Sequence, residues 1–173
     1  MSLTKRVTAG AFAGLLCAII LAAPAAAQTT ATASINAKAQ VTGIAPLTAT
    51  GVNDLDFGTV TAGTSFRQTD PTKQGRFSIA GQASQAVTVS FTLPTVLTGS
   101  GSSTIPISFG SSDGIIFSPS FPTVGGTFSP SAPYATSLNA SGALLVGITG
   151  TVAPPSLTST GLYQGTVTLT VSY

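Results

Sequence analysis

Two carboxylates come closest to a chemical pattern in this sequence. Asp54 and Asp56 flank Leu55 in NDLDFG, and alternate residues of a strand share a face, as an acid–base pair or two calcium ligands would. Calcium takes about six to eight oxygen ligands, and no Gly-spaced run of acids supplies the others. We therefore expect no metal site, but a turn that ends at Asp54, with Leu55 and Phe57 directed to the core.

Other catalytic groups are scarce. The sequence has no histidine and no tryptophan, and its single cysteine is Cys17. The usual general base and the soft metal ligands are therefore missing. Serine and threonine are abundant, but a nucleophilic serine needs a base, which Lys38, Lys73 or an aspartate would have to supply, and GSGSS lacks the lysine and the following helix of a phosphate-binding loop. We expect no enzyme and no cofactor.

Carbohydrate binding is a separate hypothesis, because sugar sites stack rings on exposed aromatic side chains. Tyr134 in SAPYAT is the best single candidate for a ligand contact. The competing interpretation is that Tyr134 covers the core. Asn139-Ala140-Ser141 matches a glycosylation acceptor, which matters only in a eukaryotic secretory route.

The first 27 residues have the layout of a signal peptide. Lys5 and Arg6 precede an apolar run over residues 7–21, and three alanines end at Ala27, where we expect cleavage. Cys17 lies inside this run after Leu16, where a lipoprotein signal has a small residue, so we expect it to be removed. We expect an exported chain in the periplasm, at the cell surface or outside the cell, with no integral membrane segment after cleavage.

Charge is sparse and unevenly placed. Residues 28–173 carry four basic and four acidic side chains, so their net charge is zero and no nucleic-acid partner is expected. Asp113 is the only charged residue after Arg76. Strand edges without charges lack the usual protection against pairing. These edges must be covered, or they meet a partner.

The pattern elsewhere predicts an all-β fold. Short runs rich in Thr, Val and Ile lie between Gly, Pro and Ser turns, and no helical spacing persists. About eight strands indicate an immunoglobulin-like two-sheet β-sandwich, with a small β-barrel as the alternative. We expect one domain over residues 28–173, with a long loop holding at most one short strand at 121–134. The expected strands are 31–45, 55–60, 76–81, 85–93, 103–110, 114–118, 143–152 and 162–173.

Two terminal strands alternate most regularly. The last places Val167, Leu169, Val171 and Tyr173 on one face, opposite threonine and serine. The first, within residues 28–45, has a lighter face and is anchored less strongly, so it can change partner more easily. Its candidate donor residues are Ala31, Ala33, Ile35, Ala37, Ala39 and Val41.

Three stretches together resemble an exported bacterial family known as domain-of-unknown-function family 4402. These are the alternating Ala/Thr opening, LDFGTV, and the closing GLYQGTVTLTVSY. The FG segment and the closing strand are also similar to spore coat protein U type pilins of archaic chaperone-usher systems. In such pilins the C-terminal strand pairs with an assembly chaperone, and an N-terminal extension fills the groove of the next subunit. This chain departs from them in its small alanine face and in having no disulfide.

The resemblance implies an exported structural protein, a pilus-like or cell-surface subunit that assembles by β-strand addition. Its partners would be like subunits or a periplasmic assembly chaperone. The alternative is a secreted monomeric binding module for a glycan or protein ligand, in which residues 31–41 pair within their own sandwich. The sequence leaves both open.

Overall fold

The computed structural model describes residues 33–41, 43–118 and 120–173. The described residues 33–40 belong to one unit, and the residues from Val41 to Tyr173 belong to a second. The expected signal peptide, Cys17 and Ala31 lie outside the described residues.

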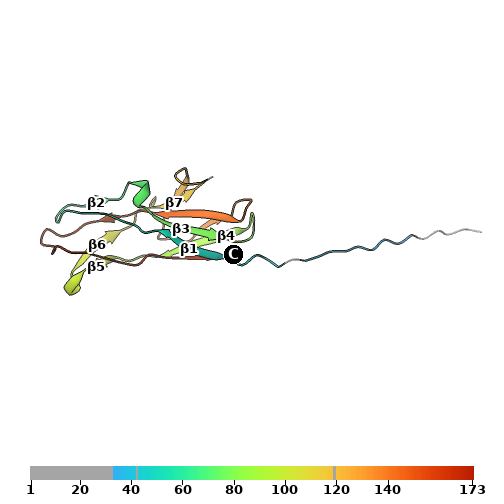
Figure 1. Cartoon of the computed structure of the whole chain (residues 1–173), viewed down its shortest axis with the longest axis horizontal. Helices are drawn as coiled ribbons and strands as arrows, with labels where there is room; N and C mark the ends of the chain where they lie inside the picture. Colours follow the sequence, from blue (N-terminus) through green and yellow to red (C-terminus); the bar gives the residue numbers. More distant parts are fainter. Residues whose placement is uncertain (1–32, 42, 119) are drawn as a thin grey trace, which may run out of the picture. The chain divides into compact units, whose positions relative to one another are not determined.

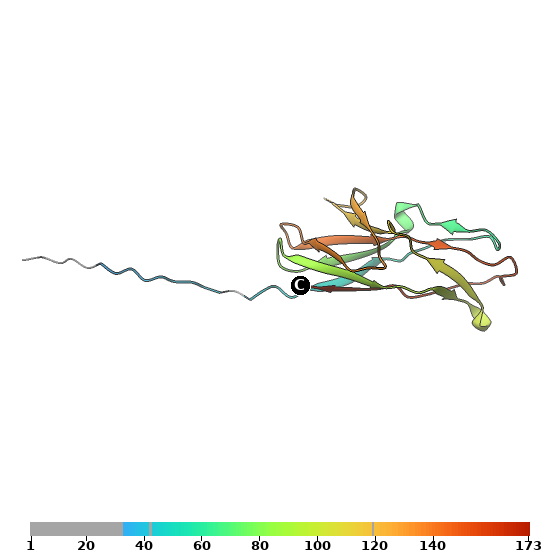
Figure 2. The same ribbon diagram turned by 180° about the vertical axis from the view of Figure 1, so that it is seen from behind.

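The second unit consists of three antiparallel sheets, shown from opposite sides in Figures 1 and 2. Two short 3-10 helices, η1 (Pro71–Lys73) and η2 (Ser100–Ser102), connect strands. The five-stranded sheet has the order β1 (Thr48–Asn53), β3 (Gly75–Ala80), β10 (Ala143–Ile148), β7 (Gly114–Phe117) and β8 (Val124–Phe128). The three-stranded sheet has the order β12 (Thr168–Ser172), β4 (Ala86–Thr92) and β9 (Tyr134–Ser137). The four-stranded sheet has the order β2 (Phe66–Arg67), β11 (Thr151–Val152), β6 (Thr104–Ser108) and β5 (Val96–Thr98).

The main core lies between the five-stranded and the three-stranded sheets. Ile79 of β3 and Val146 of β10 are fully buried against Val87 and Val89 of β4. This face-to-face packing of two apolar sheet faces is that of a β-sandwich. None of the three sheets closes on itself. The predicted all-β sandwich is thus confirmed, and the small barrel is not formed.

A second, smaller core occupies the β5–β6 end of this unit. It contains Ile105, Ile107 and Val152, with Phe57 and Tyr163 packed against them. The C-terminus lies at the opposite end, beside the start of β1 (Figures 1 and 2). The sandwich therefore contains two separate cores, placed one after the other along its length.

Several expected strands are present with shifted ends. Residues 76–81, 85–93, 103–110 and 114–118 correspond to β3, β4, β6 and β7, and the loop at 121–134 contains the short β8. The run 143–152 is divided into β10 and β11. The division occurs at Thr149 and Gly150, where the Thr149 hydroxyl donates to the Gln68 carbonyl and the Gly150 carbonyl accepts from the Gln68 N–H. These bonds form where the chain leaves the five-stranded sheet and enters the four-stranded sheet.

The predicted strand at 55–60 is wrong. Gly58 has a φ of 64°, and its N–H donates to Asp56 Oδ1 at 2.7 Å. This local turn bends the chain away from a regular ladder. Similarly, regular pairing in 162–173 begins only at Thr168. Sequence reasoning also missed β1, β2, β5 and β9.

The first predicted strand is also wrong for the single chain. Residues 33–41 and 43–47 have no assigned secondary structure. Ile35 is 94% exposed and Val41 is 93% exposed. Alternation alone gives no strand, because a strand needs a neighbour to accept its backbone hydrogen bonds. The described part of the chain has no helix with the length and hydropathy to cross a bilayer.

Candidate functional site: an apolar groove between the first and last strands

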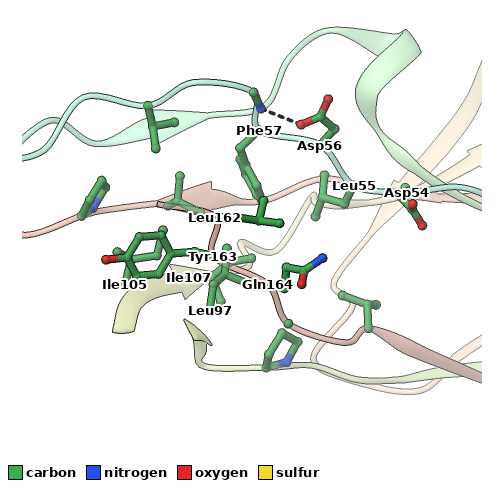
Figure 3. Close-up of a pocket in the computed structure, with 18 of the residues that line it drawn as sticks. Asp54, Leu55, Asp56, Phe57, Leu97, Ile105, Ile107, Leu162, Tyr163 and Gln164 are labelled. Atoms are coloured by element: carbon green, nitrogen blue, oxygen red, sulfur yellow. Dashed lines mark hydrogen bonds between the residues drawn. The ribbon is translucent and has the colours of Figure 1, made fainter. Parts of the chain in front are cut away.

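An open groove of about 870 Å³ lies at the β5–β6 end of the second unit. One wall is the segment 53–60 that follows β1, and the other is the segment 158–167 that leads into β12. The floor is apolar, and Figure 3 shows several of its side chains converging on the gap between the walls. The floor residues are Phe77, Leu97, Ile105, Ile107, Ile148 and Val152.

Hydrogen bonds on its outer side hold the first wall. After a register shift between Gly51 and Asn53, the pairing of β1 with β3 ends at Asn53 opposite Arg76. The Asn53 amide donates to the Gln74 carbonyl at 2.7 Å. Further along, the Asp56 N–H donates to the Lys73 carbonyl at 2.9 Å, and the Gln68 amide donates to the Asp56 carbonyl. Leu55 and Phe57 consequently point into the groove (Figure 3), as their alternation with Asp54 and Asp56 predicts.

The second wall is held from its opposite side. Gln164 and Thr98 exchange two backbone hydrogen bonds, at 2.8 and 2.9 Å. The Tyr163 hydroxyl donates to the Ser159 carbonyl at 2.8 Å and fixes the bend at the start of this wall. A side chain at Gly165 would lie 2.7 Å from Leu97, so only glycine fits there without displacing Leu97. Leu162 remains 74% exposed at the rim.

Both walls present free backbone edges to the gap. In an extended segment the N–H and C=O groups of successive residues point to opposite sides. Because Asp56 bonds outward, the backbone groups of Leu55 and Phe57 face the groove, and by the same argument so do those of Tyr163 and Gly165. Among the described residues, no backbone hydrogen bond joins segment 53–60 to segment 158–167. The gap therefore presents unpaired backbone groups on both sides, as a sheet does where one strand is absent.

Charge occurs only at the rim of the groove. Asp54 and Asp56 are its only charged lining residues, and both are exposed. Asp56 accepts a hydrogen bond from the Gly58 N–H. No cluster of three or more metal-ligating side chains occurs among residues 33–41, 43–118 and 120–173. The groove can bind an extended apolar segment, but the residues that surround it offer no acid–base pair directed at a substrate.

The predicted C-terminal residues border this site. Val167 lines the groove, and Leu169 and Val171 pack against the main core while the threonines between them are exposed. Val167, Leu169 and Val171 therefore face inward, as the alternation predicts. Tyr173 differs, because it is half-exposed and its hydroxyl bonds to Ala45 and Gln82 rather than entering the core. β12 is also an edge strand, since its sheet places it beside β4 alone.

The described residues of the predicted donor segment are exposed in the single chain. This holds for Ala33, Ala37 and Ala39 as well as for Ile35 and Val41. The segment is therefore an alternating apolar stretch whose apolar side chains are open to solvent.

Tyr134 lies away from the groove. Its ring stacks on Phe128 with centroids 4.3 Å apart, and it packs against the main core. It does not line the groove. The geometry matches the interpretation of Tyr134 as a cover for the core.

The groove itself was missed by sequence reasoning. Its floor comes from β3, β5, β6, β10 and β11, which are far apart in the chain. The nearest local signal is the pair Gly161 and Gly165, which interrupts the alternating pattern before β12 and marks where regular pairing fails.

Comparison with known proteins adds no family assignment. No protein-family model matches the chain, and no curated protein matches it. The resemblance to family 4402 and to the chaperone-usher pilins therefore stays a prediction.

Proposed function

We propose that this protein is an exported, non-catalytic structural subunit that assembles by β-strand addition. Residues 33–41 of one copy would enter the groove of a second copy, between segments 53–60 and 158–167. The supporting observation is that one chain carries an apolar groove with two free backbone edges and also an exposed alternating apolar segment. The segment would supply the backbone partner that the groove lacks, and the groove would cover the apolar side chains that the segment exposes.

The energetics favour reversible but substantial association. Full burial of Ile35 and of Val41 contributes about 1.5–3 kcal/mol each. Each new main-chain hydrogen bond adds about 0.5–1.5 kcal/mol, and both edges of the incoming strand would be paired. Part of this gain offsets the entropy of ordering the extension. Main-chain bonding supplies affinity, and the alternating side chains supply register.

The resemblance to pilins supports further parts of this proposal. A periplasmic assembly chaperone would occupy the groove before the next subunit arrives, and the assembled protein would lie at the cell surface. The edge position of β12 agrees with such a partner, because an edge strand can accept a new neighbour.

The proposal is tested by placing a charge on the donor segment. Ile35→Asp is expected to abolish concentration-dependent oligomers of the exported chain in light scattering, because an unpaired carboxylate would be buried in the groove. Its effect on the isolated subunit should be negligible, since Ile35 is exposed there. The matched control is Asn36→Asp, which places the same charge on the opposite, solvent-facing side of the extension and should assemble far better than Ile35→Asp.

Equal assembly of Ile35→Asp and Asn36→Asp would contradict the proposal. A parent chain that stays monomeric at every concentration would contradict it as well. That second result would favour the secreted binding module, with the groove open to a glycan or protein ligand.

A further inference from the structure

We infer that the inserted strand is held in register by an ion pair between Lys38 of the donor copy and the Asp54–Asp56 rim of the recipient. This inference rests on the proposed function, and it identifies which part of the extension meets which part of the groove. It also makes the partner a second copy of this chain, because the two charges belong to the same sequence.

The charges are isolated on both sides. Lys38 is the only charged residue between residues 28 and 53. Asp54 and Asp56 are the only charged residues that line the groove. The Asp54 carboxylate has no hydrogen bond or ion pair within the part of the chain that the structure describes. An incoming lysine would therefore meet an unpaired carboxylate.

On both strands the charged side chains would point to the outer, solvent-facing side of the groove. Leu55 points into the groove, so Asp54 and Asp56 lie on its outer face. Lys38 alternates with Ala37 and Ala39, so it points outward when these alanines point inward. Cross-strand neighbours on one face interact when their residues are opposite each other. The pair therefore forms on the solvent side of the completed sheet, without burial of either charge.

The spacing of the apolar side chains along the extension also fits the groove. Ile35 and Val41 lie three residues on either side of Lys38, which is about 10 Å in an extended strand. With Lys38 opposite Asp54 and Asp56, these two large side chains fall over different parts of the apolar floor. A slip by one residue would turn Lys38 into the groove and both apolar side chains out of it. Opposite charges at one position thus select a single register.

Charge exchange between two variants tests this inference on the full exported chain. Lys38→Glu alone should assemble about 3- to 10-fold more weakly than the parent, because like charges then face each other. Asp54→Lys combined with Asp56→Asn should be weakened similarly, since Lys38 then faces a lysine. Asp56→Asn keeps a side-chain carbonyl that can accept from Gly58. A 1:1 mixture of the two variants should recover assembly, because each extension then meets an opposite charge in the other variant.

The control is Ser131→Glu, which adds a negative charge at an exposed residue between β8 and β9 that does not line the groove. It should assemble like the parent. The deficits of the two rim variants should also shrink at high salt, where exposed charges are screened. Sedimentation and light scattering report the assembled fraction, and circular dichroism confirms that each variant folds.

The possible outcomes separate the two proposals. If the parent assembles but the mixture is no better than either variant alone, the register inference is wrong and strand addition stands. If the parent does not assemble, or if Ile35→Asp assembles like the parent, strand addition itself is wrong and the register inference fails with it.

Discussion

A buried carboxylate organises the polar part of this fold at the residue scale. Asp113 is 1% exposed and lies 2.5 Å from the half-exposed Arg67 guanidinium. Its other oxygen accepts from the Gly110 N–H at 2.6 Å, and its carbonyl accepts from the Thr149 N–H at 2.9 Å. These bonds join the loop before β7 to β2 and to the crossing between β10 and β11. These partners offset the cost of burying Asp113, which is the one charged residue of the C-terminal half.

Arg67→Ala is expected to lower the free energy of unfolding by about 1–3 kcal/mol, since it leaves a buried carboxylate without its cation. The loss is smaller than for a fully buried pair because water reaches Arg67. Urea unfolding of the full chain measures it. Arg67→Lys keeps the positive charge and should lose less; an equal loss in both variants would show that charge is not the cause.

Asp70 gives a pH-dependent contribution to stability. Hydrogen bonds from the Thr72 hydroxyl and the Thr72 N–H lower the pKa of Asp70 below its ordinary value of 3.8. A lowered pKa in the folded state stabilises the fold above the unfolded pKa, and this stabilisation is lost as pH falls through the folded value. Asp70→Asn should therefore be less stable than the parent at neutral pH, and the difference should vanish in acid. Thermal unfolding at a series of pH values tests this, and a constant difference would contradict it.

At the scale of elements, the start of β1 and the end of β12 are joined by one hydroxyl group. Tyr173 donates to the Ala45 carbonyl at 2.6 Å and accepts from the Gln82 N–H at 2.8 Å. The Gln82 side-chain carbonyl in turn accepts from the Ala45 N–H at 3.2 Å. A side chain at Gly81 would come within 2.5 Å of this hydroxyl, so glycine leaves room for it. The two edge strands are therefore fixed together at the end remote from the groove.

Tyr173→Phe should cost about 1 kcal/mol of unfolding free energy, because it removes both of these hydrogen bonds at a half-exposed site. Tyr134→Phe is the matched control: no hydrogen bond of its hydroxyl is present among the described residues, and its ring packing is kept. Chemical denaturation should separate the two. If both variants unfold at the same denaturant concentration, the link between the strand ends contributes no stability.

At the scale of the whole molecule, strand addition would couple stability to concentration. A ligand that binds only the folded state raises the unfolding temperature by mass action, and here the ligand is the extension of another copy. The unfolding temperature of a chain that begins at Gln28 should therefore rise with protein concentration. In the Ile35→Asp variant it should stay constant. Differential scanning calorimetry over a wide concentration range checks both, and a parent chain without this rise would argue against assembly through the groove.

The asymmetry of such an assembly would follow because the groove and the extension are different parts of one chain. Contacts of this kind are heterologous, so each added copy leaves a new groove or a new extension free. An open polymer results unless the rotation between copies closes a ring. This agrees with the sparse charge after Arg76, since the edges of each subunit would be covered in the assembly.

Local pattern was sufficient for much of the fold. Alternation with period two identified β3, β4, β6 and the apolar face of β12, because it depends only on which side of an extended chain faces the core. The same reasoning placed Leu55 and Phe57 inward and Asp54 and Asp56 outward. It failed for residues 33–41, where the alternation is regular but no neighbouring strand pairs with them in the single chain. The short apolar run of β7, buried at all four residues, was identified as a strand from the turn residues around it.

What the sequence by itself determined is the class of the fold, the facing of most strands, and the lack of histidine and of charge that makes an enzyme or a nucleic-acid partner unexpected. Only the tertiary structure decided that segments 53–60 and 158–167 leave an apolar gap with two free edges. The reason is physical: a gap is a property of pairs of segments about a hundred residues apart, and each wall is held outward by partners, Lys73 and Thr98, that local pattern does not identify.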